Sequence, residues 1–165
     1  MKKILIAYYT KTNTSRDIAQ HIASVLGKRT DNTTQVASIE SDLVLEDYDM
    51  IILGAPIHGM KWAKEAQDYV KQHKRVLEEK PLALFQCSYL DGVTRPFFQK
   101  LLQKALRNYQ KDLTVMDIGY FKGRVQDAFP PLARLLFGLE KDIPLDRYNP
   151  SEVESWAMNL AEKWE

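Results

Sequence analysis

The sequence predicts a three-layer α/β/α sandwich around a doubly wound parallel sheet, formed by a single domain that spans residues 1–165. Two observations support this prediction. Short apolar runs alternate with longer amphipathic segments, which is the pattern of β-α-β units whose sheet is covered on both faces. The length of 165 residues also matches one domain and leaves little room for a second.

The first half of the chain supplies three predicted strands and two predicted helices. Apolar runs predict strands at residues 4–9, 34–39 and 50–53, and residues of helical period predict helices at 15–26 and 62–77. Gly27 is expected to end the first helix, because glycine is common just past a helix C-terminus. Gly54 is expected to end the third strand.

The second half completes the alternation. It predicts strands at residues 82–88 and 113–118, with an amphipathic helix at 97–106 between them. An apolar segment at 128–139 is interrupted by two prolines and does not fit the alternation. The last helix is expected to begin with Asn149 as N-cap and Pro150 as its first helical residue.

The loop after the first strand concentrates four hydroxyl groups in six residues. It reads Thr10, Lys11, Thr12, Asn13, Thr14 and Ser15, and a predicted helix follows directly. Unpaired amides at a helix start carry partial positive charge, and short hydroxyl side chains add donors, so the loop suits a phosphate. Helix capping, which needs only one such residue, is the alternative explanation.

Composition and motif content exclude several classes of function. The 23 Lys+Arg and 22 Asp+Glu give a net charge of +1, which argues against nucleic-acid binding by bulk charge. One cysteine and three histidines cannot alone build an iron–sulfur or Cys/His zinc site, and no metal is predicted. The glycine pattern of dinucleotide sites and the GxxxxGK[ST] loop are both absent, so a monophosphate fits best.

The loop resembles the phosphate-binding pattern [ST]-x-T-G-x-[ST] of flavodoxins. Thr10, Thr12 and Ser15 occupy its hydroxyl positions. Asn13 stands where glycine is usual, and asparagine tolerates the left-handed backbone better than most other residues. In element order the resemblance covers nearly the whole chain. It implies a flavodoxin-like fold with five parallel strands in the order 2-1-3-4-5, and FMN as the cofactor.

Flavodoxins place the flavin ring between the loops that follow the third and fourth strands, which implies two further groups of cofactor-binding residues. They are Ala55, Pro56, Ile57, His58 and Gly59 in one loop, and Ser88, Tyr89, Leu90, Asp91 and Gly92 in the other. Among them, Gly59 allows positive φ, Pro56 stiffens its turn, and Tyr89 is the candidate for stacking on the ring.

His58 has two interpretations. A pKa near neutrality would suit it to relay a proton to the reduced flavin or to a substrate. Packing against the ring, or a hydrogen bond to the ring edge, is the alternative. No side chain is nominated as a catalytic acid or nucleophile, because the cofactor supplies the redox chemistry.

Charge and one loop separate the functional interpretations. Typical electron-carrying flavodoxins are strongly acidic, whereas the pI here is about 7.8. Residues 53–59 are similar to the third-strand loop of flavodoxin-like, menaquinone-dependent protoporphyrinogen dehydrogenases. That resemblance implies an FMN-dependent oxidoreductase passing electrons from a porphyrinogen to a quinone. A flavodoxin-type electron carrier serving a redox partner protein is the alternative, and a ligand-free interaction module is a third.

The same dehydrogenases carry an apolar and basic segment after the fifth strand, where this chain has residues 119–139. Its leucines suit a quinone, a porphyrin or the bilayer interface, and burial in the core or a homodimer contact explains them equally well. Lys122 and Arg124 are candidates to pair with substrate carboxylates, with solvated surface charge as the alternative.

No apolar run approaches the ~20 residues that a membrane-spanning helix needs. The N-terminal apolar run is also too short for an export signal. These two features predict a cytoplasmic protein, with peripheral contact to the inner face of the membrane as the alternative.

Overall fold

The computed structural model describes residues 1–29 and 31–165. Five parallel strands form its sheet in the order β2-β1-β3-β5-β6, which is the predicted order 2-1-3-4-5. Their bounds are β1 Lys3–Tyr8, β2 Thr33–Ser38, β3 Met50–His58, β5 Leu82–Ser88 and β6 Val115–Lys122. A sixth, two-residue strand, β4 (Lys61–Trp62), pairs antiparallel with the end of β3.

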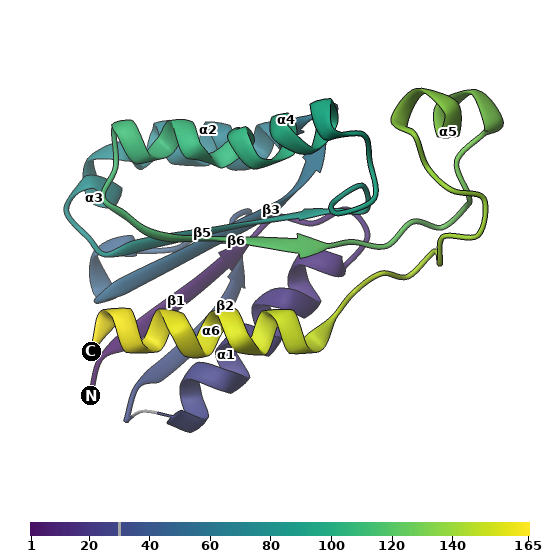
Figure 1. Ribbon diagram of the computed structural model, residues 1–165. Coiled ribbons are helices and arrows are strands. Elements are labelled where there is room, and N and C mark those ends of the chain that lie inside the picture. The colour runs from purple at the N-terminus through teal and green to yellow at the C-terminus, as the bar shows by residue number, and fades with distance from the viewer. Residues whose placement is uncertain (30) are drawn as a thin grey trace.

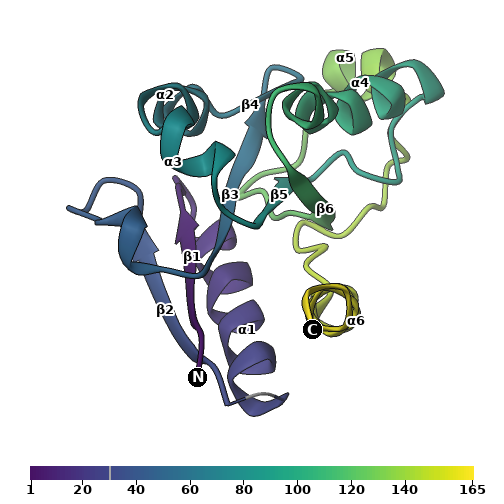
Figure 2. The same ribbon diagram turned by 90° about the vertical axis from the view of Figure 1, so that its left-hand side faces the viewer.

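Helices cover both faces of the sheet, as the three-layer prediction requires (Figures 1 and 2). The helices α1 (Thr14–Arg29) and α6 (Pro150–Trp164) pack on one face. The other face carries α2 (Lys64–Gln72), α3 (Lys74–Glu78) and α4 (Pro96–Arg107). The residues of β1, β3 and β5 between these layers are almost fully buried, so the core lies on both sides of the three central strands. Short 3-10 turns occupy Leu45–Asp47 and Asn108–Lys111.

Helix boundaries differ from the expectation at two places, one on each face of the sheet. Gly27 does not end α1, which continues to Arg29. Gly27 thus lies inside the helix, where glycine costs ~1 kcal/mol, and the last turn contacts α6 through Arg29, which lies 2.9 Å from Glu162. The predicted helix at 62–77 is likewise two helices, α2 and α3, separated at His73, where φ is −106° and ψ is 15°.

The third strand continues past Gly54, where the sequence predicted its end. Gly54 lies under the Phe85 ring, and a Cβ at position 54 would come within 1.9 Å of Phe85 Cζ. The strand then turns back into β4 through Gly59 and Met60, which have φ of 57° and 61°. Positive φ at both central residues matches a two-residue hairpin turn whose twist suits the flanking strands.

The chain leaves the sandwich after β6 and returns before α6, and we call residues 123–148 the arm. Its two ends pair antiparallel: Val125 N donates to Leu145 O at 3.0 Å and Arg147 N donates to Gly123 O at 3.2 Å. Between them, α5 (Pro131–Phe137) projects beyond the carboxyl ends of the strands (Figure 1). The predicted N-cap of α6 is confirmed, because Asn149 Oδ1 accepts from Ser151 N at 3.1 Å.

Candidate functional site

A cavity of about 680 Å³ opens at the carboxyl ends of β1, β3 and β5. Doubly wound sheets bind ligands at this edge, near the point where the strand order reverses. The volume lies within the usual range for small-molecule sites. The sequence predicted eleven of the wall residues: Thr10, Thr12, Thr14, Ser15, Pro56, Ile57, His58, Gly59, Ser88, Tyr89 and Leu90.

The first wall is the hydroxyl-rich loop between β1 and α1. Asn13 has φ of 66°, so it adopts the left-handed backbone that the sequence anticipated. Its carbonyl accepts from Asp17 N at 3.0 Å and starts the helix. Thr12 and Thr14 lie with their Oγ1 atoms 3.3 Å apart. Both line the cavity, whereas Lys11 and Asn13 do not.

Ser15 is the most informative residue of this loop. Its side chain is 1% exposed, and its Oγ has no hydrogen-bond partner among the residues that the structure describes. A buried hydroxyl without a partner costs ~1–3 kcal/mol. Ser15 lies in the first turn of α1 and lines the cavity, so its orphaned hydroxyl fits an anionic ligand group at the helix N-terminus. The loop therefore fits a terminal phosphate.

The second wall comes from the extended end of β3. Pro56, Ile57, His58 and Gly59 line the cavity, while Ala55 is fully buried behind them with its carbonyl accepting from Trp62 Nε1 at 3.1 Å. Burial, followed by the charge of Lys11, lowers the pKa of His58, and Glu65 partly opposes this shift. His58 is therefore mainly neutral at neutral pH and can accept a hydrogen bond.

The third wall is the loop after β5. Ser88, Tyr89 and Leu90 line the cavity, but Asp91 and Gly92 do not. Gln99 holds these two residues, since its Nε2 lies 2.6 Å from Asp91 Oδ1 and its Oε1 lies 2.9 Å from Gly92 N.

Tyr89 anchors the arm as well as lining the cavity. Its hydroxyl donates to Pro144 O at 2.9 Å, and its ring centre lies 5.6 Å from that of Phe129. Arg147 lies 5.8 Å from the Tyr89 ring centre and donates to the Tyr89 carbonyl at 2.6 Å. Stacking of Tyr89 on a cofactor ring stays a prediction, and it requires one face of the ring to be clear of these neighbours.

The fourth wall was not among the predicted cofactor-binding residues, although Arg124 was a candidate to pair with substrate carboxylates. The arm supplies Gly123, Arg124, Val125, Gln126, Asp127, Phe129 and Phe137 to it, and Met60, Cys87 and Leu102 complete the cavity. The proline-interrupted apolar segment was the signal for this wall. Because this segment is distant from the other loops along the chain, the sequence did not show that it folds back over them. Cys87 is buried, and burial raises the pKa of its thiol to about 12.

Two cations of this region have different roles. Lys122 pairs with Glu152 at 2.5 Å and does not line the cavity. Arg124 does line it, and its guanidinium contacts Asp17 at 2.7 Å and Asp146 at 3.1 Å. The hydrogen bond to Asp17 is the main cause of the raised pKa of Arg124. Arg124 is therefore a fixed positive charge beside the first turn of α1.

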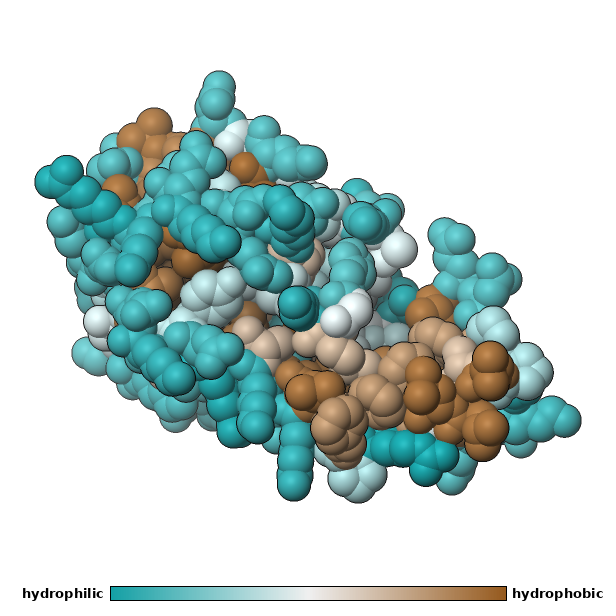
Figure 3. Space-filling view, turned by 90° about the horizontal axis from the view of Figure 1, so that it is seen from above, coloured by the Kyte–Doolittle hydropathy of each residue, from teal (hydrophilic) through white to brown (hydrophobic). Residues whose placement is uncertain are grey.

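An apolar surface patch lies next to the cavity. Leu132, Leu135 and Leu136 of α5 are 78%, 69% and 58% exposed, and Phe97 of α4 is 66% exposed. Figure 3 shows hydrophobic side chains gathered at the end of the molecule that carries α5. Neighbouring residues of the same segment, Phe129 and Phe137, line the cavity, so the patch continues its apolar wall outward.

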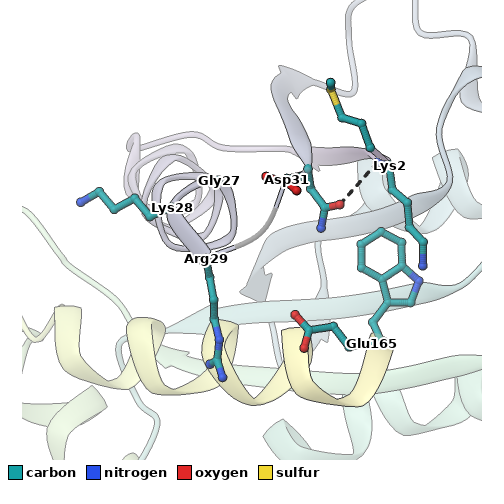
Figure 4. Close-up of a pocket in the computed structure, with 9 residues that line it drawn as sticks. Lys2, Gly27, Lys28, Arg29, Asp31 and Glu165 are labelled. Carbon is teal, nitrogen blue, oxygen red and sulfur yellow. Dashed lines mark hydrogen bonds between the residues drawn. The ribbon is translucent and has the colours of Figure 1, made fainter.

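A second hollow, of about 700 Å³, lies at the opposite end of the sheet beside both chain termini (Figure 4). Its cations diverge: Arg29 reaches Glu162, Lys2 Nζ lies 4.6 Å from the Trp164 ring centre, and Lys28 points away. Its described residues therefore present no converging polar set.

The described part of the chain has neither a metal-binding cluster nor a membrane-spanning helix. No group of three or more His, Cys, Asp or Glu residues there could hold a metal ion. No helix within residues 1–29 and 31–165 has the length and apolar character needed to cross a bilayer.

The fold and the cavity at its strand ends define a doubly wound protein with a hydroxyl-rich loop at the N-terminus of α1. The family model Flavodoxin_5, described as a flavodoxin domain, matches residues 5–128, and the chain belongs to this family. A search of curated proteins finds no significant sequence match.

Solved structures show the same fold. Oxidised flavodoxin 1 from Bacillus cereus is 18% identical with a TM-score of 0.62, and the match covers 97% of each chain. A Fusobacterium nucleatum flavodoxin bound to flavin mononucleotide is 15% identical with a TM-score of 0.59 over 99% of each chain. An NADH:FMN oxidoreductase in its apo form is 13% identical with a TM-score of 0.64, covering 98% of this chain and 89% of that one. At these identities the likeness establishes the fold.

Proposed function

We propose that this chain binds FMN and acts as a small flavin-dependent oxidoreductase of the protoporphyrinogen dehydrogenase type. The observation that carries the FMN proposal is the buried, unpartnered Ser15 hydroxyl beside three threonines in the cavity wall. When bound, FMN supplies electron and hydride transfer through its ring. The chain's own residues bind the phosphate, enclose the ring and hold the substrate side of the cavity.

Two features favour an enzyme over a simple carrier. The net charge of +1 gives no strongly acidic surface to steer basic partners. The arm also extends the cavity with Phe129 and Phe137, which form an apolar wall suited to a flat substrate such as a porphyrinogen or a quinone. On this proposal the porphyrinogen is oxidised and the quinone is reduced within one cavity.

The patch on α5 has three candidate contacts within this proposal. Its exposed leucines suit the apolar part of a substrate, the membrane interface or a second copy of the chain. The position of the patch beside the cavity is what links it to the same function.

Two measurements test the proposal in sequence. A visible spectrum of freshly purified protein, with mass identification of the released chromophore, should reveal FMN. Anaerobic mixing of the holoprotein with protoporphyrinogen and a quinone analogue should then form porphyrin above a control of free FMN. A colourless preparation that takes up no FMN on titration would support the interaction-module alternative and refute the proposal.

An electron carrier is the second candidate. The exposed patch beside the cavity favours it, because a partner protein could dock there close to the flavin ring. Reduction by a reductase and reoxidation by a partner protein, without direct turnover of a small substrate, would select this candidate.

A further inference from the structure

Arg124 lines the cavity, but the FMN-phosphate proposal gives it no role. It lies at the start of the arm and lines the same cavity as Thr12, Thr14 and Ser15. Its Nη1 donates to Asp17 Oδ2 at 2.7 Å, and Asp17 belongs to the first turn of α1. The guanidinium is thereby fixed beside the helix terminus that carries the orphaned Ser15 hydroxyl.

The second partner of Arg124 belongs to the returning end of the arm. Arg124 Nε donates to Asp146 Oδ2 at 3.1 Å, and the guanidinium lies 4.9 Å from the ring centre of Tyr148. A guanidinium has five N–H donors. These contacts use Nε and Nη1, and the structure gives Nη2 no acceptor among residues 1–29 and 31–165.

Arg124 offers an anion a cation that is already held in place. Asp17 and Asp146 both contact its guanidinium. Asp127 also lines the cavity and Glu65 interacts with Lys11, so the region has no net positive charge, and any attraction for an anion is local to Arg124. A phosphate can therefore approach a cation that is already oriented.

We propose that Arg124 is an anion-binding residue of this site, which pairs with the terminal phosphate of the flavin and links that phosphate to the arm. This inference rests on the proposed binding of FMN. Asp17 orients Arg124 and also competes with the phosphate for it. The same guanidinium bridges the two ends of the arm, so phosphate binding reinforces the wall that encloses the substrate side of the cavity.

The test compares FMN with riboflavin, which lacks the phosphate, by quenching of flavin fluorescence. Arg124→Gln should raise the Kd for FMN about tenfold or more, because it removes a charge-assisted hydrogen bond, and should change the Kd for riboflavin less than about twofold. The FMN effect should shrink as salt rises. Lys122→Gln is the matched control, since Lys122 is two residues away and faces Glu152 outside the cavity.

Asp17→Asn is a second test variant, and the tighter binding expected of it cannot result from a damaged fold. It keeps Arg124 and removes the competing charge, so FMN should bind about threefold or more tightly while riboflavin binding stays unchanged. If Arg124→Gln fails to fold, as judged by its melting curve, Arg124→Lys takes its place: it keeps a positive charge near Asp17 but loses the planar fork of donors, and it should weaken FMN and leave riboflavin unchanged. Unchanged or weaker FMN binding in Asp17→Asn overturns the inference, as does equal weakening of both flavins in Arg124→Gln.

Failure of the proposed function looks different. A native protein that binds neither flavin, or binds riboflavin as tightly as FMN, has no phosphate site for Arg124 to join. A native protein that prefers FMN, with the full preference retained in Arg124→Gln, overturns only the role of Arg124.

Discussion

Replacing Ser15 by alanine should move stability and cofactor affinity in opposite directions. The Ser15 hydroxyl is buried and unpartnered, so removing it should stabilise the ligand-free protein by about 1 kcal/mol, or raise its melting temperature by about 2–4 °C. The same change removes a hydrogen bond to the phosphate dianion. Such bonds contribute about 1.5–3 kcal/mol, so the Kd for FMN should rise about 10- to 100-fold.

Two assays on one preparation test the expected gain in stability and the expected loss of affinity for FMN. Thermal unfolding of the flavin-free protein measures stability, and fluorescence titration measures the Kd for FMN and for riboflavin. Ser24→Ala is the matched control, because Ser24 is exposed on the same helix. Lower stability in Ser15→Ala, or equal loss of affinity for both flavins, would refute the reasoning. Adding Thr12→Ala should weaken FMN further and leave riboflavin binding nearly unchanged.

Three further predictions concern the strands around the cavity. Gly54→Ala should lower the free energy of unfolding by about 2–3 kcal/mol in urea titrations, because its Cβ would overlap the buried Phe85 ring; an unchanged midpoint would contradict this. The NMR titration midpoint of His58 should lie below 6.5 and should rise in Lys11→Gln. Because the pKa of His58 is lowered in the folded state, its contribution to the free energy of unfolding should be lost as pH falls below 6.5. The Cys87 thiol, with a pKa of about 12, should resist alkylation at pH 8 until the protein unfolds, and its contribution to stability should fall as pH rises above 9.

Most of the sandwich followed from local patterns in the sequence. The apolar runs of β1, β3 and β5 contain few polar residues, since these strands are covered on both faces. The errors lie where contacts between distant segments override local preference. Gly27 is a normal helix-ending signal, but α1 runs past it to Arg29, which contacts Glu162 of α6. Gly54 signalled a strand end, but its role is to accommodate Phe85.

The candidate site was predictable only in part, for a related reason. The hydroxyl loop is contiguous in sequence, so the pattern alone predicted the cavity-lining Thr12 and Ser15 and the left-handed backbone at Asn13. The arm wall depends on contacts that join residues far apart in the chain, such as that between Arg124 and Asp17. No local pattern shows where the arm folds back onto the sandwich. The resemblance indicated that the segment is apolar and basic, but not which residues it contacts.

The antiparallel pairing at the base of the arm has an evolutionary consequence. Because Val125 and Leu145 meet through a backbone hydrogen bond, the chain between them begins and ends at nearly the same point in space. Lengthening or shortening such a closed loop changes its closure entropy only slowly, and the sheet beneath need not move. Insertions and deletions in the arm can therefore change the arm's side of the cavity during evolution, while the sheet and the loop between β1 and α1 stay in place.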